Sequence, residues 1–464
     1  MNIINAMTDP KLFGNQFAGE SWAPWLALLA GFYGLPMTPE QRDIFQTITE
    51  RPDAPTAPHD ELWLIIGRRG GKSFIAALLA VFEAVFNNHK DKLAAGEVAT
   101  VAVIASDRKQ ARTVLRYIKG LLQNPLLEPL IVREGPESIE LSNYCVIEIM
   151  TASYRASRGY TLACVICDEI AFWMIEGANP DADIIRAIRP SLATLGGKLI
   201  ALSSPYARRG VLWSQYRAHY GRAGRILVAQ APTALMNPTL PVQVIADAYH
   251  EDPLSAAAEF GAQFRTDVEG FVTMEVLDAC TRPSQREILP DSSTSYTAFV
   301  DPSGGSADAF TLAIAHRTKD KFVIIDATRT VKPPFSPESV VVEFCTLLKS
   351  YRIREIHGDA YAGEWPREQF AKRGITYKRS QKNKSELYQD LLPMLNSNSV
   401  ELPPDNHLHR ELLGLERRTA RGGRDSIDHA PGMHDDLANA VAGALVHART
   451  RADLMLDLKV RFPT

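Results

Sequence analysis

The first half of the chain alternates short apolar runs with longer helical patterns. Apolar runs of strand length lie at 62–66, 98–105, 145–150, 163–167 and 198–202, and helical patterns cover 74–86 and 107–122. Apolar strands that are separated by helices indicate a parallel sheet with helices on both faces. Such sheets bind ligands at the carboxyl ends of their strands, so we expect a site at that edge.

The second half follows a different order. The pattern predicts three successive strands at 296–300, 310–315 and 322–326, then a helix at 337–350, a strand at 355–358 and a closing helix at 435–447. A three-stranded meander followed by alternating helices and strands is typical of an RNase H-type sheet. Between the halves, 242–264 has a mainly helical pattern and 281–295 is polar and rich in turn residues. We therefore expect two α/β domains, at 1–240 and 291–464, joined by a connection at 241–290.

The composition is that of a globular protein too long for one ordinary core. Of the 464 residues, 45% are apolar, and the formal net charge of −3 gives no overall nucleic-acid signature. The odd number of cysteines, five, favours a reducing compartment over a disulfide scaffold. Cys164 and Cys167 point to opposite faces of a predicted strand, which argues against a zinc site. The apolar run 22–37 is interrupted by proline and glycine, so we expect a packed helix in a soluble, cytoplasmic protein without a membrane segment.

The first predicted strand runs directly into a glycine-rich loop, and its residues have the chemistry of a phosphate-binding P-loop. Backbone N–H groups of such a loop surround phosphate oxygens, a lysine reaches the terminal phosphates, and a serine hydroxyl ligates Mg²⁺. The nucleotide-binding residues are therefore expected to be Gly67, Arg68, Arg69, Gly70, Gly71, Lys72 and Ser73. A chance Gly-Lys-Ser turn is the alternative, and the strand before and helix after argue against it.

Two features of this loop depart from the usual spacing. Ile66 stands where the common pattern has glycine, and two arginines fill the loop. Arg68 or Arg69 could place a guanidinium on a γ-phosphate, as arginine fingers do, or could simply pair with a surface carboxylate.

A second nucleotide-site element follows the predicted strand 163–167. That strand ends in Asp168 and Glu169, which fits a Walker B element in which Asp168 holds Mg²⁺ and Glu169 polarises the attacking water. The alternative is that the two acids cap the next helix. After the next strand come Ser203 and Ser204, hydroxyls that could sense the γ-phosphate.

In their order, these motifs resemble the large terminase subunits of tailed bacteriophages, which package viral DNA. The resemblance covers about 38–215 and includes the arginine-bearing P-loop without its first glycine, the strand-to-helix segment 105–111, Asp168-Glu169 and Ser203-Ser204-Pro205. It implies an ASCE-type P-loop ATPase domain that binds ATP with Mg²⁺ and has an N-terminal lid region at about 1–58. By resemblance, Gln41 contacts adenine, Arg68 is the likelier catalytic arginine, and Arg158, in Ser157-Arg158-Gly159, is a sensor, an inter-subunit contact or a structural arginine.

In the second half, carboxylates stand at the ends of predicted elements. Asp301 ends the first strand, Asp359 follows the strand 355–358, and Asp435 and Asp436 open the closing helix. Two-metal phosphodiester hydrolysis needs three or four converging carboxylates. The expected strand order places Asp301 beside Asp359 with the closing helix across them. Taken singly, each acid could be a turn or N-cap residue, as could Asp308, a possible fourth ligand.

This region, about 296–447, resembles the terminase nuclease domain, which has an RNase H-like fold and uses Mg²⁺ or Mn²⁺. The resemblance implies a metal-binding and catalytic triad of Asp301, Asp359 and Asp436, with Asp435 the rival for the third place. Glu364 is a weaker alternative to Asp359, because some relatives use glutamate there.

Basic residues cluster in two segments of the second half. Seven lie between 366 and 385, and four arginines, Arg417, Arg418, Arg421 and Arg424, surround the Gly422-Gly423 turn. Phosphate contacts of this kind give sequence-independent binding of DNA, whereas a solvated basic face is the alternative.

Together the resemblances imply a packaging motor that drives double-stranded DNA into a procapsid and cuts concatemers in the cytoplasm of the infected host. Its implied partners are the portal protein, the small terminase subunit and further copies of the chain in a pentameric ring. A helicase-like or repair ATPase with a non-catalytic DNA-binding second half is the alternative. A structural portal adaptor with a vestigial nucleotide site is a third.

Overall fold

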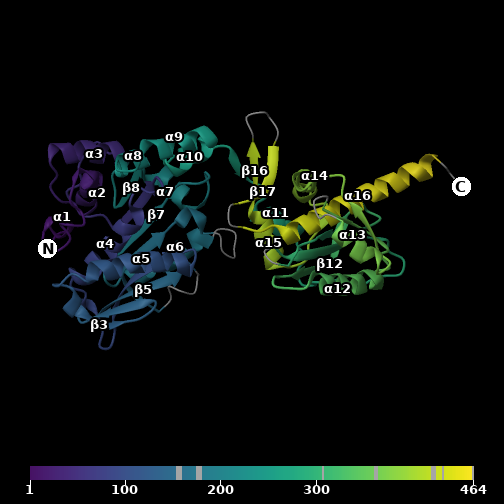
Figure 1. The fold of residues 1–464 in the computed structure, drawn as a ribbon, viewed down its shortest axis with the longest axis horizontal. Helices are drawn as coiled ribbons and strands as arrows, with labels where there is room; N and C mark the ends of the chain where they lie inside the picture. Colours follow the sequence, from purple (N-terminus) through teal and green to yellow (C-terminus); the bar gives the residue numbers. More distant parts are fainter. Residues whose placement is uncertain are drawn as a thin grey trace. The chain divides into compact units, whose positions relative to one another are not determined.

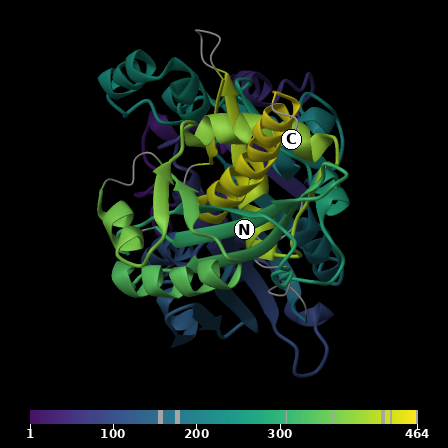
Figure 2. The ribbon, with the colours of Figure 1, turned by 90° about the vertical axis from the view of Figure 1, so that its right-hand side faces the viewer.

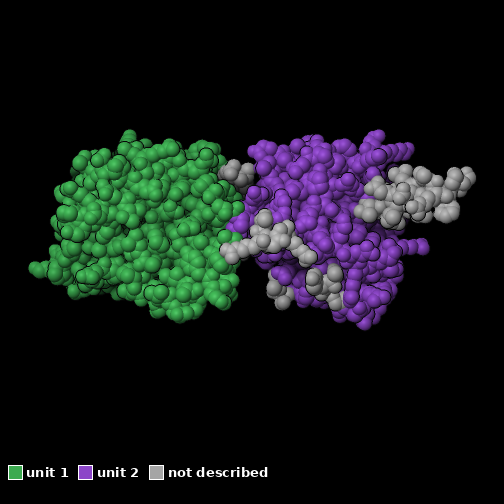
Figure 3. All heavy atoms as spheres, turned by 90° about the horizontal axis from the view of Figure 1, so that it is seen from above, with its two compact units in different colours: residues 1–266 green, residues 267–464 purple. Residues whose placement is uncertain are grey.

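The chain folds into two compact units. The computed structural model describes residues 1–152, 159–173, 180–305, 308–359, 364–419, 425–430 and 433–461, and its units are Met1–Thr266 and Asp267–Thr464 (Figure 3). The segment 241–290, expected to form a connection, is divided between them. Helices α9 (Val242–Glu251) and α10 (Pro253–Glu259) lie in the first unit, whereas β9 (Val268–Gly270) and α11 (Met274–Cys280) lie in the second.

The first unit is built on an eight-stranded sheet with the order β3-β4-β5-β2-β6-β7-β1-β8 (Figure 1). The strands β5, β2, β6, β7, β1 and β8 are parallel, while β3 and β4 form an antiparallel edge. One strand, β7, separates β1 from β6, so the P-loop strand and the strand with the acidic pair are not neighbours. This order is the one expected for an ASCE-type P-loop domain. The strand bounds are β1 Glu61–Ile66, β2 Ala99–Ala105, β3 Ile131–Glu134, β4 Ser138–Leu141, β5 Cys145–Thr151, β6 Thr161–Asp168, β7 Lys198–Ser203 and β8 Ile226–Ala231.

Helices cover both faces of this sheet, as the apolar strands predicted. The helices are α1 Ile3–Thr8, α2 Ala23–Phe32, α3 Pro39–Thr49, α4 Lys72–Val85, α5 Arg108–Leu122, α6 Pro180–Leu192, α7 Gly210–His219 and α8 Thr233–Met236, with α9 and α10. On one face, α4 and α5 share a hydrophobic cluster with the N-terminal helices, and on the other, α6 and α7 form a second cluster. Cys164 belongs to the first cluster and Cys167 to the second, so the two thiols do lie on opposite faces.

The N-terminal region, expected to include a lid at 1–58, packs into the core of the first unit. Ile3, Trp25 and Phe45 are buried in the same cluster as α4. The role of this region as a lid stays a prediction. In the part of the chain that the structure describes, no helix combines the length and the apolar character needed to cross a membrane.

The second unit has a six-stranded sheet with the order β14-β13-β10-β11-β12-β15, and a smaller sheet of β17, β16 and β9. β10, β11 and β12 form the predicted antiparallel meander, and β13 pairs with β10 in parallel. The bounds are β10 Tyr296–Asp301, β11 Phe310–Arg317, β12 Val323–Val331, β13 Glu355–Gly358, β14 Thr376–Arg379, β15 Val400–Glu401, β16 Leu415–Thr419, β17 Asp425–His429, α12 Pro337–Ser350, α13 Trp365–Ala371, α14 Lys384–Asn396, α15 Asn406–Leu413 and α16 Asp436–Arg461. This is the RNase H-like arrangement expected.

The closing helix α16 lies across one face of this sheet, and α12 packs on the opposite face (Figure 2). Small residues let α16 approach closely, since a Cβ atom built on Gly443 would lie 2.3 Å from the Phe299 ring on β10. This close packing brings the first turn of α16, which begins at Asp436 directly after Asp435, to the end of β10.

On the face of α16 that packs against the sheet, the half-buried His447 lies against aromatic rings. Its ring stacks on His357, with centroids 4.2 Å apart, and lies beside Phe299. Burial, then His357 and Lys382, lower the pKa of His447 to about 4. The unfolded chain takes up a proton near pH 6.5, so this histidine contributes stability above that pH and loses it as the pH falls through about 4.

We expect His447→Phe, which keeps the ring stack and removes the titration, to flatten the acid dependence of stability. Between pH 7 and pH 4 the free energy of unfolding of the parent should fall by up to ~3 kcal/mol more than that of the variant. The reason is that the pKa of His447 is about 4 in the folded chain and about 6.5 in the unfolded chain. Denaturant midpoints at several pH values measure this difference, and parallel profiles for the two proteins would contradict it.

Candidate active sites

The P-loop connects β1 to α4, and Lys72 at the start of α4 contacts the loop. Gly71 caps α4 with φ 90°, a conformation that favours glycine, and Gly70 N–H donates to Gly67 O at 3.1 Å. Lys72 Nζ donates to Ile66 O at 3.0 Å and to Ser204 Oγ at 2.9 Å. Ser73 is the second residue of α4. The loop, the start of the helix and the end of β7 therefore form one site.

Residues far along the chain hold this loop in place. Thr233 Oγ donates to Arg68 O at 2.7 Å, and Asn237 Nδ2 donates to Arg69 O at 2.8 Å. A Cβ atom on Gly67 would lie 2.3 Å from Thr233 Oγ, so this position has no room for a side chain. From the other side, Trp25 Nε1 donates to Gly70 O at 3.0 Å. Sequence reasoning missed these partners, because no local motif marks them.

Of the two alternatives for Arg68, a contact with a γ-phosphate or a pair with a surface carboxylate, the structure shows the pair. Its Nη1 lies 3.0 Å from Glu259 Oε2 on α10, and its side chain is 64% exposed. Exposed ion pairs contribute only about 0–1 kcal/mol, so this pair is easily exchanged for a phosphate. The roles of Arg68 and Arg69 toward a nucleotide stay predictions.

Asp168 ends β6, and its carboxylate is buried with one oxygen, Oδ1, that has no hydrogen-bond partner among the described residues. Burial, followed by repulsion from Glu169, raises the pKa of Asp168 to about 7. A buried acid with an orphaned oxygen suits a divalent cation, so the residue fits the Mg²⁺ ligand expected from the sequence.

Glu169 is turned toward the predicted phosphate site. It has φ 50°, an uncommon backbone conformation, and the structure gives it no capping hydrogen bond to the short helix that follows. Instead Oε2 accepts from Ser203 Oγ at 2.9 Å and from Ser204 N–H at 3.2 Å, and Oε1 lies 3.8 Å from Lys72 Nζ. The capping alternative is therefore not what the structure shows for Glu169.

Two expected nucleotide-site residues are placed differently or not described. Gln41 forms a capping box at the start of α3, accepting from Thr38 N–H at 3.0 Å and donating from its own N–H to Thr38 Oγ at 3.3 Å. Its contact with adenine stays a prediction. Ser157 and Arg158 lie outside the described residues.

In the second unit, five of the candidate acids line one cavity of about 510 Å³: Asp301, Asp308, Asp359, Asp435 and Asp436. Asp301 ends β10, and Asp359 follows the neighbouring parallel strand β13, as expected from the strand order. Asp301 Oδ2 accepts from Asn439 Nδ2 at 2.8 Å. Burial, and then the charges of Asp359, Asp436 and Asp435, raise the pKa of Asp301 to about 8. The site therefore concentrates negative charge that a cation would relieve.

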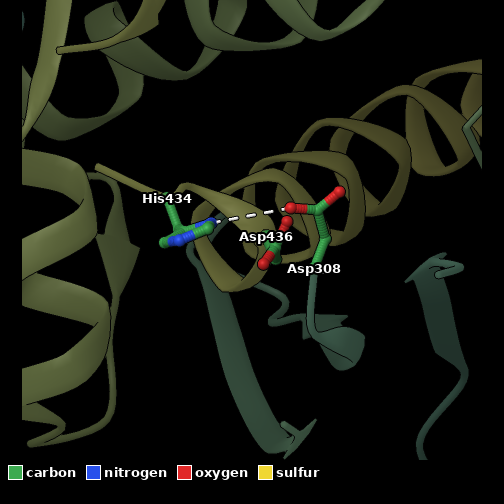
Figure 4. Close-up of side chains that lie close together, drawn as sticks. All are labelled: Asp308, His434 and Asp436. Atoms are coloured by element: carbon green, nitrogen blue, oxygen red, sulfur yellow. Dashed lines mark ion pairs between the residues drawn. The ribbon is translucent and has the colours of Figure 1, made fainter. Parts of the chain in front are cut away.

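Asp436 faces Asp308 and His434 at the rim of this cavity (Figure 4). Each of the three offers a ligand atom within 4.8 Å of the others, and His434 Nδ1 lies 3.6 Å from Asp308 Oδ1. Asp436 Oδ2 accepts from Ala309 N–H at 3.0 Å. Burial raises the pKa of Asp436. These donors have the chemistry of a divalent-metal site.

Asp435, the rival for the third ligand, is held by α14. Lys384 Nζ donates to its Oδ1 at 3.2 Å, and Tyr388 OH donates to its Oδ2 at 2.9 Å. Lys384 also donates to Asp428 Oδ1 at 2.7 Å. The sequence placed Lys384 in a basic DNA-binding segment, whereas in the structure it lines the acidic cavity.

Glu364, the weaker alternative to Asp359, does not line this cavity. It ion-pairs with Arg379 at 2.7 Å and with Arg367 at 3.4 Å. Among the described residues, six of the seven basic residues between 366 and 385 pair with an acid: Arg367, Arg373, Lys378, Arg379, Lys382 and Lys384.

The second basic segment is only partly described. Arg417 pairs with Asp425, and Arg418 lies 3.3 Å from Glu416. Arg421, Gly422, Gly423 and Arg424 lie outside the described residues.

The fold and its sites define a protein with a P-loop unit of the ASCE type and an RNase H-like unit lined with acids. No family model and no curated protein matches the chain. Among solved structures, the chain is similar to the large terminase of bacteriophage HK97, with 16% identity, a TM-score of 0.39, and coverage of 93% of this chain and 100% of that chain.

Two further structures are similar. A large terminase from a thermophilic bacteriophage, in complex with ADP, is 11% identical, with a TM-score of 0.37, and the match covers 83% of this chain and 93% of that chain. The large terminase nuclease of the thermophilic phage G20c with bound magnesium is 17% identical, with a TM-score of 0.32 and coverage of 37% of this chain and 94% of that chain. These are structures of the family that the sequence motifs resemble.

Proposed function

We propose that this chain is a large terminase subunit, an ATPase that drives double-stranded DNA and a metal-dependent nuclease that cuts it. One observation carries the proposal: a single chain holds both a P-loop whose Lys72 contacts Glu169 and Ser204 and a cavity lined by five of the expected carboxylates. Each arrangement suits one of the two reactions. The cavity acids argue against a helicase-like protein with a non-catalytic second half, and the P-loop site argues against a structural adaptor.

In the first unit, Lys72 and the backbone of 67–71 would bind the β- and γ-phosphates, with Arg68 reaching the γ-phosphate after leaving Glu259. Ser73 and Asp168 would hold Mg²⁺, which when bound screens the phosphate charge. Glu169 would accept a proton from the attacking water. Ser203 and Ser204 orient its carboxylate by two hydrogen bonds, so they would link the state of the phosphate site to β7.

In the second unit, Asp301, Asp359 and Asp436 would hold Mg²⁺ or Mn²⁺, which when bound lowers the pKa of a water molecule and stabilises the leaving oxygen. Asn439 fixes one oxygen of Asp301, and the backbone of Ala309 fixes one oxygen of Asp436. These hydrogen bonds orient the carboxylates before any cation binds.

The basic segments of the second unit would contact DNA phosphates. Their present pairs with acids are mostly exposed, so phosphate oxygens could replace the acids at little cost. In this proposal the chain works as a pentameric ring with the portal protein on a procapsid and with the small terminase subunit, in the cytoplasm of the host.

The proposal is tested on the purified chain with supercoiled plasmid, ATP and metal. We expect Mn²⁺ or Mg²⁺ to support both cleavage and ATP hydrolysis, and EDTA to abolish both, because carboxylate sites without a cation cannot activate water. Gel analysis of the plasmid and phosphate release measure the two reactions. Metal-dependent ATP hydrolysis without cleavage would favour the helicase-like alternative.

A further inference from the structure

Lys384 and Tyr388 place two donors of α14 on one carboxylate of the acidic cavity. The two residues are four apart, so they lie on the same face of the helix. Tyr388 is fully buried, and Asp435 is 5% exposed. Both oxygens of Asp435 are thereby engaged, at 2.9 Å by the tyrosine and at 3.1–3.2 Å by the lysine.

The same lysine joins Asp435 to a second acid. Its ammonium group lies 2.7 Å from Asp428 Oδ1 on β17. Asp428, His429 and Asp435 each offer a ligand atom within 4.8 Å of the others, which is a spacing that a metal ion could use. Lys384 therefore makes, with Asp428 and Asp435, the contacts that a cation would make.

The charges around the cavity show why this matters. Six acids line it: Asp301, Asp308, Asp359, Asp428, Asp435 and Asp436. Among the described residues that line it, Lys384 and Arg418 carry a fixed positive charge. Arg418 donates to Glu416 and to the carbonyl oxygen of His429, whereas Lys384 contacts the cavity acids Asp428 and Asp435.

We propose that Lys384 is a positioning residue of the nuclease site, which takes the place of a metal ion between Asp428 and Asp435 and fixes Asp435 on the cavity wall. This inference rests on the proposed nuclease function. In this proposal Asp428 and Asp435 bind Lys384, whereas Asp301, Asp359 and Asp436 would bind the metal ion. Asp435 then supports the site without being its main ligand.

If Lys384 instead bound a DNA phosphate, its contacts and its effect on DNA binding would differ from those of a positioning residue. To reach DNA, the ammonium group would have to leave two carboxylates, one of them buried, and an unpaired buried charge is costly. A lysine that contacts a phosphate also contributes to the salt dependence of DNA binding, whereas a lysine that holds carboxylates does not. The two roles are therefore separable by measurement.

The test compares Lys384→Met, Lys384→Gln and Lys384→Arg in the full chain. Electron paramagnetic resonance of free Mn²⁺ gives the number of ions bound per chain, and plasmid cleavage gives kcat and KM for DNA at several salt concentrations. We expect the Met and Gln variants to bind one more Mn²⁺ per chain than the parent. Their kcat should fall about 10- to 100-fold, as for other residues that orient metal-site ligands, with KM and its salt dependence unchanged. Arginine should keep the parental stoichiometry and restore most of kcat.

Lys119→Met is the matched control. Lys119 pairs with Glu134 at 2.8 Å in the first unit and has a side chain 28% exposed, against 30% for Lys384. The control should leave Mn²⁺ stoichiometry and cleavage unchanged, and if methionine prevents folding at position 384, the glutamine variant provides the same comparison.

Two results would overturn the inference. One is an unchanged Mn²⁺ stoichiometry in both neutral variants. The other is a raised KM with a salt slope reduced by about one, which would make Lys384 a phosphate contact. A parent chain that neither binds Mn²⁺ nor cuts DNA would instead refute the proposed nuclease function, so the two failures are distinguishable.

Discussion

Asp301→Asn is expected to abolish Mn²⁺-dependent cleavage of plasmid DNA while ATP hydrolysis continues. The side chain lies at the end of the central strand, among acids whose charges help to raise its pKa, and asparagine removes the charge that would attract the metal. If the metal no longer stabilises the transition state by several kcal/mol, the rate of cleavage falls by about a thousandfold or more. The substitution keeps the shape of the side chain and an oxygen that can accept from Asn439, so the fold should persist.

Asp320→Asn is the control for this result. Asp320 lies in the turn between β11 and β12, at the end of the hairpin opposite to the Asp301–Thr311 pair. We expect cleavage by this variant to match the parent. Cleavage by the Asp301 variant within a few-fold of the parent, at equal Mn²⁺ occupancy, would refute the assignment of the cavity as a nuclease site.

The placement of Asp301 and Asp359 at the ends of neighbouring strands could be predicted, because the strands are recognisable and the fold class determines their order. Short runs of strand-forming residues identify β10 and β13, and the strand order of an RNase H-type sheet makes them neighbours. The small residues around Gly443 are visible in the sequence as well, and they allow the close packing of α16.

The partners of these acids could not be predicted in the same way. Nothing around Lys384 distinguishes it from the basic residues beside it, and its contact with Asp435 spans 51 positions. The contact of Thr233 with the P-loop spans 165 positions. Such contacts depend on how complete elements pack. β8, the edge strand that pairs with β1, was also missed, although 226–231 is an apolar run of strand length.

The P-loop site illustrates how a weak motif gains meaning from geometry. Ser203-Ser204-Pro205 alone carries little information, since short hydroxyl-rich turns are common. In the structure, Ser203 contacts Glu169, and Ser204 contacts both Glu169 and Lys72. These hydrogen bonds join the ends of β6 and β7 to the loop after β1, so one change at this junction should affect catalysis strongly.

Glu169→Gln is expected to reduce ATP turnover by about 100- to 10,000-fold, the range of a lost general base, while plasmid cleavage continues. Glutamine keeps the size of the side chain and an oxygen for Ser204 N–H, but it cannot take a proton from water. Because Lys72 and the loop backbone are unchanged, nucleotide binding should persist. Phosphate release measures turnover, and a fluorescent ADP analogue measures binding.

Glu140→Gln provides the matched control, because Glu140 is a half-buried acid of β4 that pairs with Arg133 at 3.5 Å, outside the nucleotide site. Its turnover should equal that of the parent. If Glu169→Gln loses nucleotide binding together with turnover, the carboxylate acts through Lys72, which lies 3.8 Å away, and is not the base. If turnover stays within a few-fold of the parent, Glu169 has no essential role in catalysis, and the hydrogen bonds from Ser203 and Ser204 serve only to hold its side chain in place.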